Sequence, residues 1–352
     1  MKILVIQQKM IGDVLASSII CNNLRAIYPE AKIHYLVYPF TTAVIENNPN
    51  IDRIILFEDS YRKSSNEFFK FLKCIKKEKY DILIDAYGKI ESHLVVSFSF
   101  AKIKIGFNKS YSDIIYNKTV ESVPKLLTNA GAALENRLNL VKALRPEIPL
   151  DIKPKIFLTS EEIEEGKKVL ENNEIDFSKK IFMIGVLGSG PNKTYPAPYM
   201  AEILDFIVEK SDATLLFNYI PSQINQAKEI FDLCKIETQK HIKIDFIPGN
   251  IREFLSILYH CNALIGNEGG AVNMAKAIDI PTFSIFSTWI NKESWNSFED
   301  GITHASVHLK DFLPKLYGKK SAKKMKKKRM KLYEKFVPEL IFPELNDYLK
   351  QQ

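Results

Sequence analysis

The chain has 352 residues and a net charge of +7, with 46% hydrophobic and 26% charged residues. This length exceeds what one typical core accommodates, so we expect two domains of an ordinary globular protein. The four cysteines are scattered without a Cys-x-x-Cys pair, which argues against a disulfide framework or zinc ribbon and favours the cytoplasm. No stretch approaches the ~20 apolar residues of a membrane span, and the apolar run Ile3–Ile6 is too short for a signal peptide.

Short apolar strands alternate with helical segments in the first half of the chain. Ile3–Ile6 is predicted to be a buried strand, and the helix Val14–Ile27 follows it and ends before Pro29. Further strands are expected at Lys32–Val37, Arg53–Phe57, Ile82–Asp85 and Ile103–Gly106, and helices at Phe68–Lys79 and Asn129–Leu144. This alternation predicts an α/β fold with a parallel, doubly wound sheet.

A proline-rich segment, Arg145–Pro154, interrupts this pattern and is predicted to connect two domains. An acidic helix, Ser160–Asn172, follows it. A second strand–helix series is then expected, with strands at Ile181–Leu187, Ala213–Phe217, Ile242–Ile247, Ala263–Gly266 and Thr282–Phe286. We place the first domain at 1–155 and the second at 156–335. The remaining segment, 336–352, is expected to be helical. It could pack back on the N-terminal domain. Two such domains facing each other would form a ligand-binding cleft.

The stretch Asn262–Pro281 is typical of a phosphate-binding strand–turn–helix unit. A short apolar strand ends in a glycine pair, and Ala271, Met274, Ala275 and Ile278 then follow helical spacing. The free N–H groups and the dipole at the start of such a helix favour an anion. The alternative is that Gly269 and Gly270 only permit a tight turn.

A comparable unit opens the chain, where strand Ile3–Ile6 leads into Gly12 and Asp13. Gly12 permits a tight turn, and Asp13 is placed at or near the start of the next helix. Asp13 is then either an ordinary helix cap or a carboxylate presented at the carboxyl edge of the sheet.

The opening sequence KILVIQQKMIGDVLASSIICNNLRAIYPEAKIHYLV resembles that of the ADP-heptose:lipopolysaccharide heptosyltransferase family, the family-nine glycosyltransferases. Later segments resemble the family's motifs in the same order and with similar spacing across nearly the whole chain. They are Asn48–Arg53 (NPNIDR), Tyr80–Gly88 (YDILIDAYG), Ile103–Phe107, Gly188–Pro196 (GSGPNKTYP) and Gly266–Pro281.

The resemblance implies a GT-B fold of two Rossmann-like domains, with the acceptor side in the first domain and the donor side in the second. It also implies an inverting, metal-independent transfer of a sugar from a nucleotide-diphosphate donor such as ADP-heptose to a lipopolysaccharide core or related glycolipid, without a cofactor. Asp13 corresponds to the proposed general base, and Lys193 is the matched cation for the leaving diphosphate. The implied donor-binding residues are Ser189, Asn267, Glu268, Gly269, Gly270, Ala271 and Asn273, and the acceptor-side residues are Gly12, Lys89 and Ser92.

The chain departs from the family pattern at several polar positions. Glu268 stands at a position that is acidic in the family, Gly269 at its usual threonine and Asn273 at its histidine. In the first domain, Glu91 stands where the family often has a basic residue, and Lys89 is the cation nearest to it in the sequence. Gln223 replaces an expected acidic residue. These changes leave the donor sugar, the acceptor and the level of activity open.

The basic run Lys319–Lys331 holds nine cations and no acid. It is either a solvated charged segment or a contact to an anionic inner membrane surface, where each cation contributes ~1 kcal/mol. No nucleic-acid recognition motif accompanies it. His304 and His308 share one side of a predicted strand without further ligands, which argues against a metal site. Trp289 and Trp295 either stack on a ligand or cover the core.

Two alternatives to a glycosyltransferase follow from the same residues. One is a non-catalytic binder of nucleotide sugars or glycolipids, because several polar family positions are changed. The other, a Rossmann oxidoreductase, is the weaker, because QQKMIGD stands where its G-x-G-x-x-G fingerprint should follow the first strand.

Overall fold

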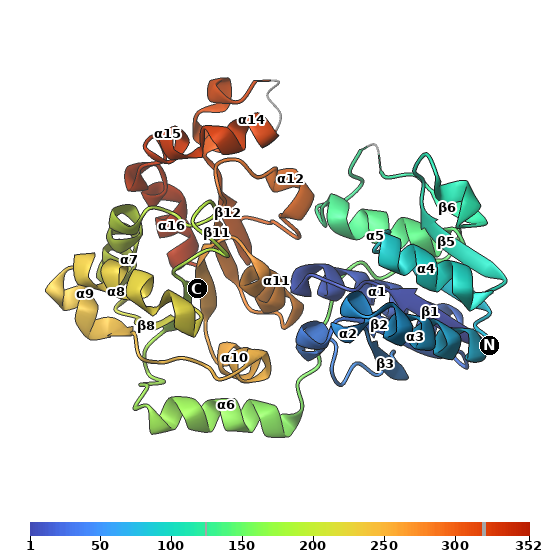
Figure 1. Cartoon of the computed structure of the whole chain (residues 1–352). Coiled ribbons are helices and arrows are strands. Elements are labelled where there is room, and N and C mark those ends of the chain that lie inside the picture. Colours follow the sequence, from blue (N-terminus) through green and yellow to red (C-terminus); the bar gives the residue numbers. More distant parts are fainter. Residues whose placement is uncertain (124, 319–321) are drawn as a thin grey trace. The chain divides into compact units, whose positions relative to one another are not determined.

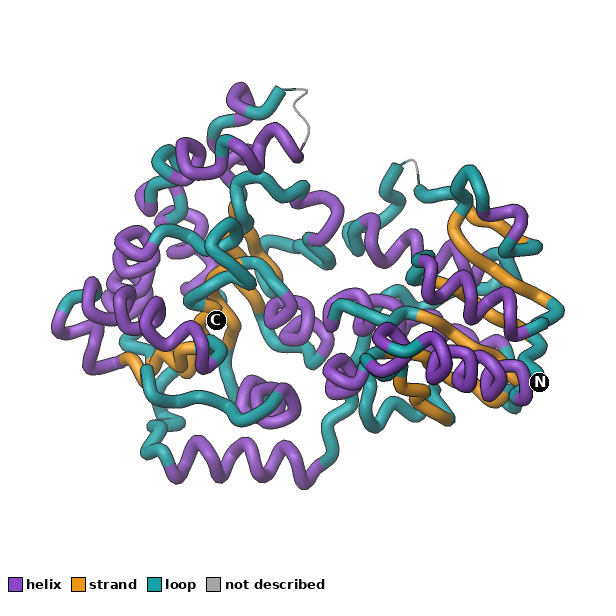
Figure 2. Tube along the Cα trace, in the orientation of Figure 1, coloured by secondary structure: helices purple, strands orange, loops and turns teal. Residues whose placement is uncertain are grey.

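The computed structural model describes residues 1–123, 125–318 and 322–352. The chain divides into two compact units, Met1–Phe157 and Leu158–Gln352. In each unit a parallel sheet is flanked by helices (Figures 1 and 2). Each unit is described here by itself.

The first unit contains a six-stranded parallel sheet of order β3-β2-β1-β4-β5-β6. Its elements are β1 (Lys2–Ile6), α1 (Ile11–Ile27), β2 (Lys32–Val37), η1 (Pro39–Val44), β3 (Arg53–Leu56), α2 (Ser60–Lys63), α3 (Ser65–Lys77), β4 (Ile82–Asp85), α4 (Ile90–Ser99), β5 (Ile103–Phe107), η2 (Ser112–Ile114), β6 (Lys118–Val120) and α5 (Ala132–Lys142). The central strands are buried on both faces, as expected for β-sheets covered by helices.

The second unit contains a six-stranded parallel sheet of order β12-β11-β10-β7-β8-β9. Its strands are β7 (Ile181–Gly185), β8 (Thr214–Phe217), β9 (Ile242–Lys243), β10 (Ala263–Asn267), β11 (Thr282–Ile285) and β12 (His304–Val307). Its helices are α6 (Ser160–Asn172), α7 (Ala197–Ser211), η3 (Pro221–Gln223), α8 (Ile224–Leu233), α9 (Ile236–His241), α10 (Ile251–Leu258), α11 (Gly270–Ala277), α12 (Lys292–Trp295), α13 (Leu309–Phe312), η4 (Pro314–Leu316), α14 (Ala322–Lys327), α15 (Arg329–Tyr333), η5 (Pro338–Leu340) and α16 (Phe342–Leu349).

Most predicted elements are present, with ends shifted by a few residues. Strands β2 and β4 have the predicted bounds, and α1 begins three residues earlier than predicted. Two corrections are larger. The strand predicted at Ile242–Ile247 is only Ile242–Lys243, because β9 is an edge strand with one hydrogen-bonded neighbour. Helix α4 was absent from the prediction, because Ile90 and Leu94 are exposed and its apolar residues follow no single helical stripe.

The C-terminal segment belongs to the second unit and packs within its core. Phe336, Ile341 and Leu345 are buried in the core of the second unit. The Phe342 ring stacks on Phe206 of α7 at 4.5 Å between centroids. The helical C-terminal segment is divided, because Pro338 starts η5 between α15 and α16.

Both sheets have the same relative strand order, and this order positions the candidate site residues. In a parallel sheet, ligands bind at the carboxyl ends of the strands where the strand order reverses, called the switch point. The switch point lies between β1 and β4 in the first unit and between β7 and β10 in the second. The loops and first helical turns that follow these four strands contain Asp13, Lys89, Lys193 and Glu268.

Candidate functional site

The switch point of the second unit is built on a close approach of two glycines. Gly266 of β10 has a φ of +136°, and a Cβ there would lie 2.4 Å from the Gly185 carbonyl oxygen of β7. The two strand ends can approach so closely because Gly266 carries no side chain. This contact fixes where the chain leaves β10 toward α11.

Asn267, the last residue of β10, joins the two loops of this switch point. Its buried amide donates to the carbonyls of Gly185 and Val186 at 2.9 and 3.0 Å, and its Oδ1 accepts from the Tyr195 N–H at 2.7 Å. The amide is thus occupied by the protein's own backbone. The expected donor-binding residue Asn267 therefore has the geometry of a positioning residue.

Gly269, Gly270 and Ala271 form the beginning of α11. A Cβ on Gly269 or Gly270 would meet nothing within 4 Å, so the space in front of the helix start is open. The first N–H groups of a helix have no acceptor within it, and the helix dipole favours an anion there. Asn273 lies in the first turn of the same helix, where its side chain is half-buried.

Glu268 and Lys193 meet at this helix start. The Lys193 Nζ lies 4.0 Å from the Glu268 Oε2, which is buried and has no hydrogen-bond partner among the described residues. Burial raises the pKa of Glu268, and the Lys193 ammonium opposes this rise. The pair combines a cation with an unsatisfied carboxylate oxygen that can accept a hydrogen bond from a ligand.

The loop that carries Lys193 is held by backbone contacts at both ends. Gly188 is required there, because a Cβ would lie 2.3 Å from the Lys193 carbonyl oxygen. Thr194 accepts from the Gly188 N–H at 3.1 Å and donates to the Gly190 carbonyl at 3.1 Å. Ser189 is exposed on this loop.

Two neighbouring segments support the same loop. Trp289, after β11, donates its indole N–H to the Asn192 carbonyl at 2.8 Å, so this tryptophan braces the loop. Gln223, after β8, donates to the Gly188 carbonyl at 3.1 Å. An acidic residue at position 223 would lack this donor, so the glutamine supports the loop in a way that a carboxylate could not.

At the switch point of the first unit, Asp13 lies in the first turn of α1. Gly12 is therefore helical, and the turn predicted around it lies earlier, between β1 and α1. One carboxylate oxygen of Asp13 accepts from the Met10 N–H at 3.3 Å, and the other accepts from the Arg137 Nη2 at 2.8 Å. The Asp13 side chain retains 30% exposure, so it can still reach an external hydroxyl.

The other two acceptor-side residues, Lys89 and Ser92, lie after β4 at the start of α4. Ser92 is buried, and its hydroxyl accepts from the Lys89 N–H and donates to the Lys89 carbonyl, which leaves it a capping role. The Lys89 side chain is exposed. Glu91, which stands at a basic family position, forms an ion pair with Arg62 at 3.2 Å. A cation is thus present near this position, although it comes from α2.

The family model described as glycosyltransferase family 9 (heptosyltransferase) matches residues 68–326. The chain belongs to this family. Lipopolysaccharide heptosyltransferase 1 of Campylobacter coli is 23% identical over 297 residues, which cover 81% of this chain and 84% of the relative.

Solved structures of the family share the fold along the whole chain. The family 9 glycosyl transferase of Veillonella parvula has a TM-score of 0.76 at 15% identity and covers 100% of this chain and 97% of its own. ADP-heptose lps heptosyltransferase II of Escherichia coli has a TM-score of 0.72 at 16% identity, with coverages of 100% and 99%. The GT-B fold predicted from the sequence is confirmed. Because this chain belongs to family 9, it is a glycosyltransferase.

Sequence reasoning missed Arg137, the partner of Asp13 in this glycosyltransferase. Arg137 lies on α5, and its guanidinium also donates to the Ser17 hydroxyl at 2.6 Å and the Ala133 carbonyl at 2.7 Å. A signal was present, because Leu134, Leu138 and Val141 surround this arginine on the inward stripe of a predicted helix. A charge on such a stripe requires a buried partner.

Other features of the family 9 chain concern metals and membranes. Among residues 1–123, 125–318 and 322–352, no group of three His, Cys, Asp or Glu side chains is arranged to hold a metal ion. Burial lowers the pKa of His308 to about 4. Within the same ranges, none of the helices has the length and apolar character needed to cross a bilayer.

The basic run Lys319–Lys331 lies partly outside the described residues, which exclude Lys319, Lys320 and Ser321. The rest forms α14 and α15 of the second unit. Met325 is buried in the core, and the Lys326 Nζ lies 4.7 Å from the centroid of the Trp289 ring. The neighbouring Lys323 and Lys324 remain exposed.

Proposed function

We propose that this family 9 glycosyltransferase moves a heptosyl group from ADP-heptose, or a closely related nucleotide sugar, to a lipopolysaccharide core or similar glycolipid. The first unit contributes the acceptor half-site and the second the donor half-site. The transfer inverts the anomeric centre and needs no metal ion or cofactor. The observation that carries this proposal is Asp13, which is partly exposed and oriented by Arg137 at the switch point of a family 9 chain.

In the proposed reaction, an acceptor hydroxyl oxygen attacks the anomeric carbon from the face opposite the diphosphate. The bond between that carbon and the diphosphate oxygen breaks, and the nucleoside diphosphate leaves with the electron pair. Asp13 takes the proton of the hydroxyl as the new bond forms. A carboxylate is a weak base toward a hydroxyl, so positioning supplies much of the effect.

The leaving diphosphate gains negative charge as its bond to the sugar breaks. The Lys193 ammonium and the N–H groups at the start of α11 supply the opposing charge in the proposed donor half-site. The Glu268 Oε2 has no hydrogen-bond partner among the described residues. We assign it to a hydroxyl of the donor, because a carboxylate accepts hydrogen bonds and would repel a phosphate.

The decisive experiment measures nucleoside diphosphate release from ADP-heptose and from other nucleotide sugars, with and without truncated lipopolysaccharide. We expect acceptor-dependent release that Asp13→Asn nearly abolishes, while donor binding survives. Asp113→Asn, in the same unit, is the matched control. Turnover that persists in Asp13→Asn would remove Asp13 as the base.

A non-catalytic nucleotide-sugar binder is the second candidate, and the changed residues Glu268, Gly269 and Asn273 favour it. Donor binding without turnover toward any acceptor would decide for this candidate.

We also propose that the protein works at the inner face of the cytoplasmic membrane and contacts anionic lipid through Lys319–Lys331. Lys323 and Lys324 are exposed, which supports this contact. Deletion of 319–324, before the buried Met325, should weaken sedimentation with phosphatidylglycerol vesicles. Unchanged sedimentation would contradict the proposed contact.

A further inference from the structure

Helices α3 and α4 of the first unit lie side by side (Figure 1). Both expose apolar side chains. Ile90 and Leu94, four residues apart on α4, are 76% and 39% exposed. Phe69 of α3 is 46% exposed, and its ring lies 6.1 Å from that of Phe98 on α4. Phe100, directly after α4, is 66% exposed. Isolated exposed apolar residues are common, but several of them gathered on two adjacent helices indicate an interaction surface.

Lysines of α3 border these apolar side chains. The Lys73 Nζ lies 4.7 Å from the centroid of the Phe69 ring, and the Lys76 Nζ lies 4.6 Å from that of Phe100. Lys77 is exposed on the same helix. We call the set Phe69, Lys73, Lys76, Lys77, Ile90, Leu94, Phe98 and Phe100 the α3–α4 surface.

The acidic residues next to the α3–α4 surface are paired with cations outside it. Glu67 forms an ion pair with Lys70 at 2.7 Å, Glu78 pairs with Lys2 at 2.7 Å, and Glu91 pairs with Arg62. The α3–α4 surface therefore carries an excess of positive charge, which comes from its lysines.

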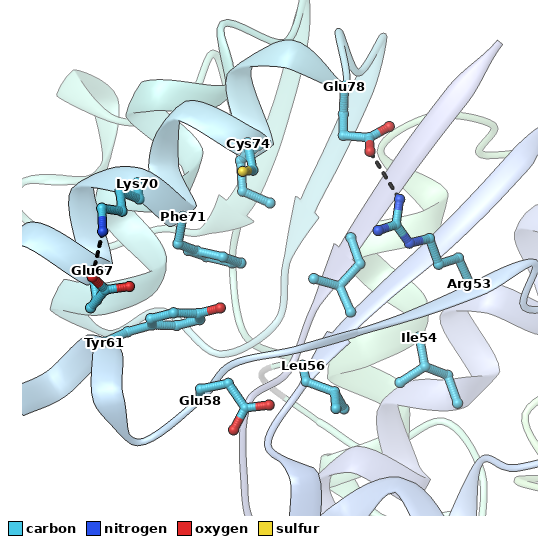
Figure 3. Close-up of a pocket in the computed structure, with 12 residues that line it drawn as sticks. Arg53, Ile54, Leu56, Glu58, Tyr61, Glu67, Lys70, Phe71, Cys74 and Glu78 are labelled. Atoms are coloured by element: carbon cyan, nitrogen blue, oxygen red, sulfur yellow. Dashed lines mark hydrogen bonds and ion pairs between the residues drawn. The ribbon is translucent and has the colours of Figure 1, made fainter.

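The opposite flank of α3 differs from this surface. A hollow of about 360 Å³ lies there between α3 and β3 (Figure 3). Arg53 pairs there with Glu78 at 3.0 Å and Lys70 with Glu67, and Glu58 adds a further acidic side chain. The hollow therefore lacks the excess of cations found on the α3–α4 flank.

We propose that the α3–α4 surface binds an anionic lipid bilayer. Its aromatic and aliphatic side chains would enter the headgroup region, while the lysines extend their long stems to contact lipid phosphates. This partner is favoured over a second protein copy because like-charged lysines would face one another across a symmetric interface.

The position of the α3–α4 surface gives lipid binding a consequence for catalysis. Helix α4 begins after β4, and α1, which carries Asp13, begins after β1. These strands are adjacent and parallel, with Ile6 opposite Asp85, so both helices begin at the same edge of the sheet. A sugar acceptor on a bound lipid would then be presented at the edge that holds Asp13. This consequence rests on the proposed function, whereas the lipid binding itself does not.

Vesicle sedimentation of the full-length protein tests the inference. The vesicles contain phosphatidylcholine alone or phosphatidylcholine with phosphatidylglycerol. One variant combines Lys73→Gln, Lys76→Gln and Lys77→Gln, and a second combines Phe69→Gln, Ile90→Gln and Leu94→Gln. The matched control combines Lys168→Gln, Lys228→Gln and Lys235→Gln, which removes three exposed lysines from the second unit. Circular dichroism and thermal unfolding verify that every variant is folded.

We expect the lysine variant to lose roughly 100-fold in partitioning to the anionic vesicles. The apolar variant should lose at least about tenfold and keep that deficit at high salt, where electrostatic attraction is screened. The control should lose clearly less than the lysine variant. Wild-type partitioning of both test variants would overturn the inference. So would a dimer, detected by sedimentation velocity, that the apolar variant dissociates without a change in vesicle binding.

The vesicle-binding result does not depend on whether the proposed function is correct. Vesicle binding is measured without donor or turnover, so it can succeed even if no transfer is found. Transfer to a soluble, lipid-free acceptor fragment should be equal in all three variants and in the wild type. A loss of transfer to that fragment would show that the substitutions damaged the enzyme, and would overturn a role limited to lipid contact.

Discussion

The Arg137 Nη2 donates a hydrogen bond to the Asp13 Oδ1 at 2.8 Å and thereby joins α5 to the start of α1. Arg137 is nearly buried, and its other hydrogen bonds reach Ser17 and the Ala133 carbonyl. Because the guanidinium is held at three points, it fixes the direction of the Asp13 carboxylate. The orientation of the proposed base thus depends on a residue that comes more than a hundred positions later in the chain.

Replacing Arg137 with methionine should therefore lower kcat by roughly 10- to 100-fold, because a misdirected base loses effective concentration. Arg137→Lys should give an intermediate kcat, because an ammonium retains the charge but lacks the guanidinium fork. Donor affinity, measured by calorimetry, should stay at the wild-type value in both variants. Wild-type turnover in folded Arg137→Met would show that Asp13 needs no such support.

Glu268 should make donor binding sensitive to acid. Burial raises the pKa of this carboxyl, so its charged form is lost at a higher pH than for an exposed glutamate. If the carboxylate accepts a donor hydroxyl, affinity should weaken as the pH falls through this raised pKa. Glu268→Gln should remove that pH step. An unchanged pH profile of donor affinity in the glutamine variant would assign the step to another group.

The strand–helix alternation made the architecture predictable from the sequence. Buried parallel strands such as Ile82–Asp85 are short continuous apolar runs, which pattern reasoning detects. Helix α4 was missed because its outer side carries Ile90 and Leu94 in place of polar residues. Its apolar residues occur on several sides, so the usual helical stripe is absent. The feature that hid the helix is also the feature that suggests a lipid contact.

The site was predictable at the level of loops and less so at the level of side-chain roles. The motifs around Asp13 and Lys193 follow β1 and β7, which lie at the points where the strand order reverses. The sequence did not reveal that the Asn267 amide is occupied by backbone groups or that Ser92 caps α4. These roles depend on which strands become neighbours, because Asn267 contacts residues about eighty positions away. Local patterns do not contain that information.

Asn267→Ala should destabilise the second unit. The substitution leaves the Tyr195 N–H and the carbonyls of Gly185 and Val186 without their side-chain partner in a buried place. Each unsatisfied buried group costs about 1–3 kcal/mol, so we expect a loss of roughly 2–5 kcal/mol in the free energy of unfolding. Urea denaturation measures this loss. Asn218→Ala, directly after β8 of the same sheet, is a control, and an equal effect there would argue against a special role for Asn267.

Lys276 should make stability rise with pH in the alkaline range. This buried lysine of α11 donates to the Ser297 carbonyl at 2.5 Å, and burial lowers its pKa from 10.5 to about 8. Between these two pH values the unfolded chain holds the proton and the folded protein releases it. Stability therefore increases with pH in this window, by on the order of 3 kcal/mol for this group.

The test compares the free energy of unfolding of the wild type with that of Lys276→Met between about pH 7.5 and about pH 10. The difference between the two proteins is used because other groups titrate in the same range. The wild type should gain stability relative to the variant across this span, whereas Lys210→Met, at an exposed lysine, should follow the wild type. Parallel curves for wild type and Lys276→Met would show that Lys276 keeps its proton in the folded protein.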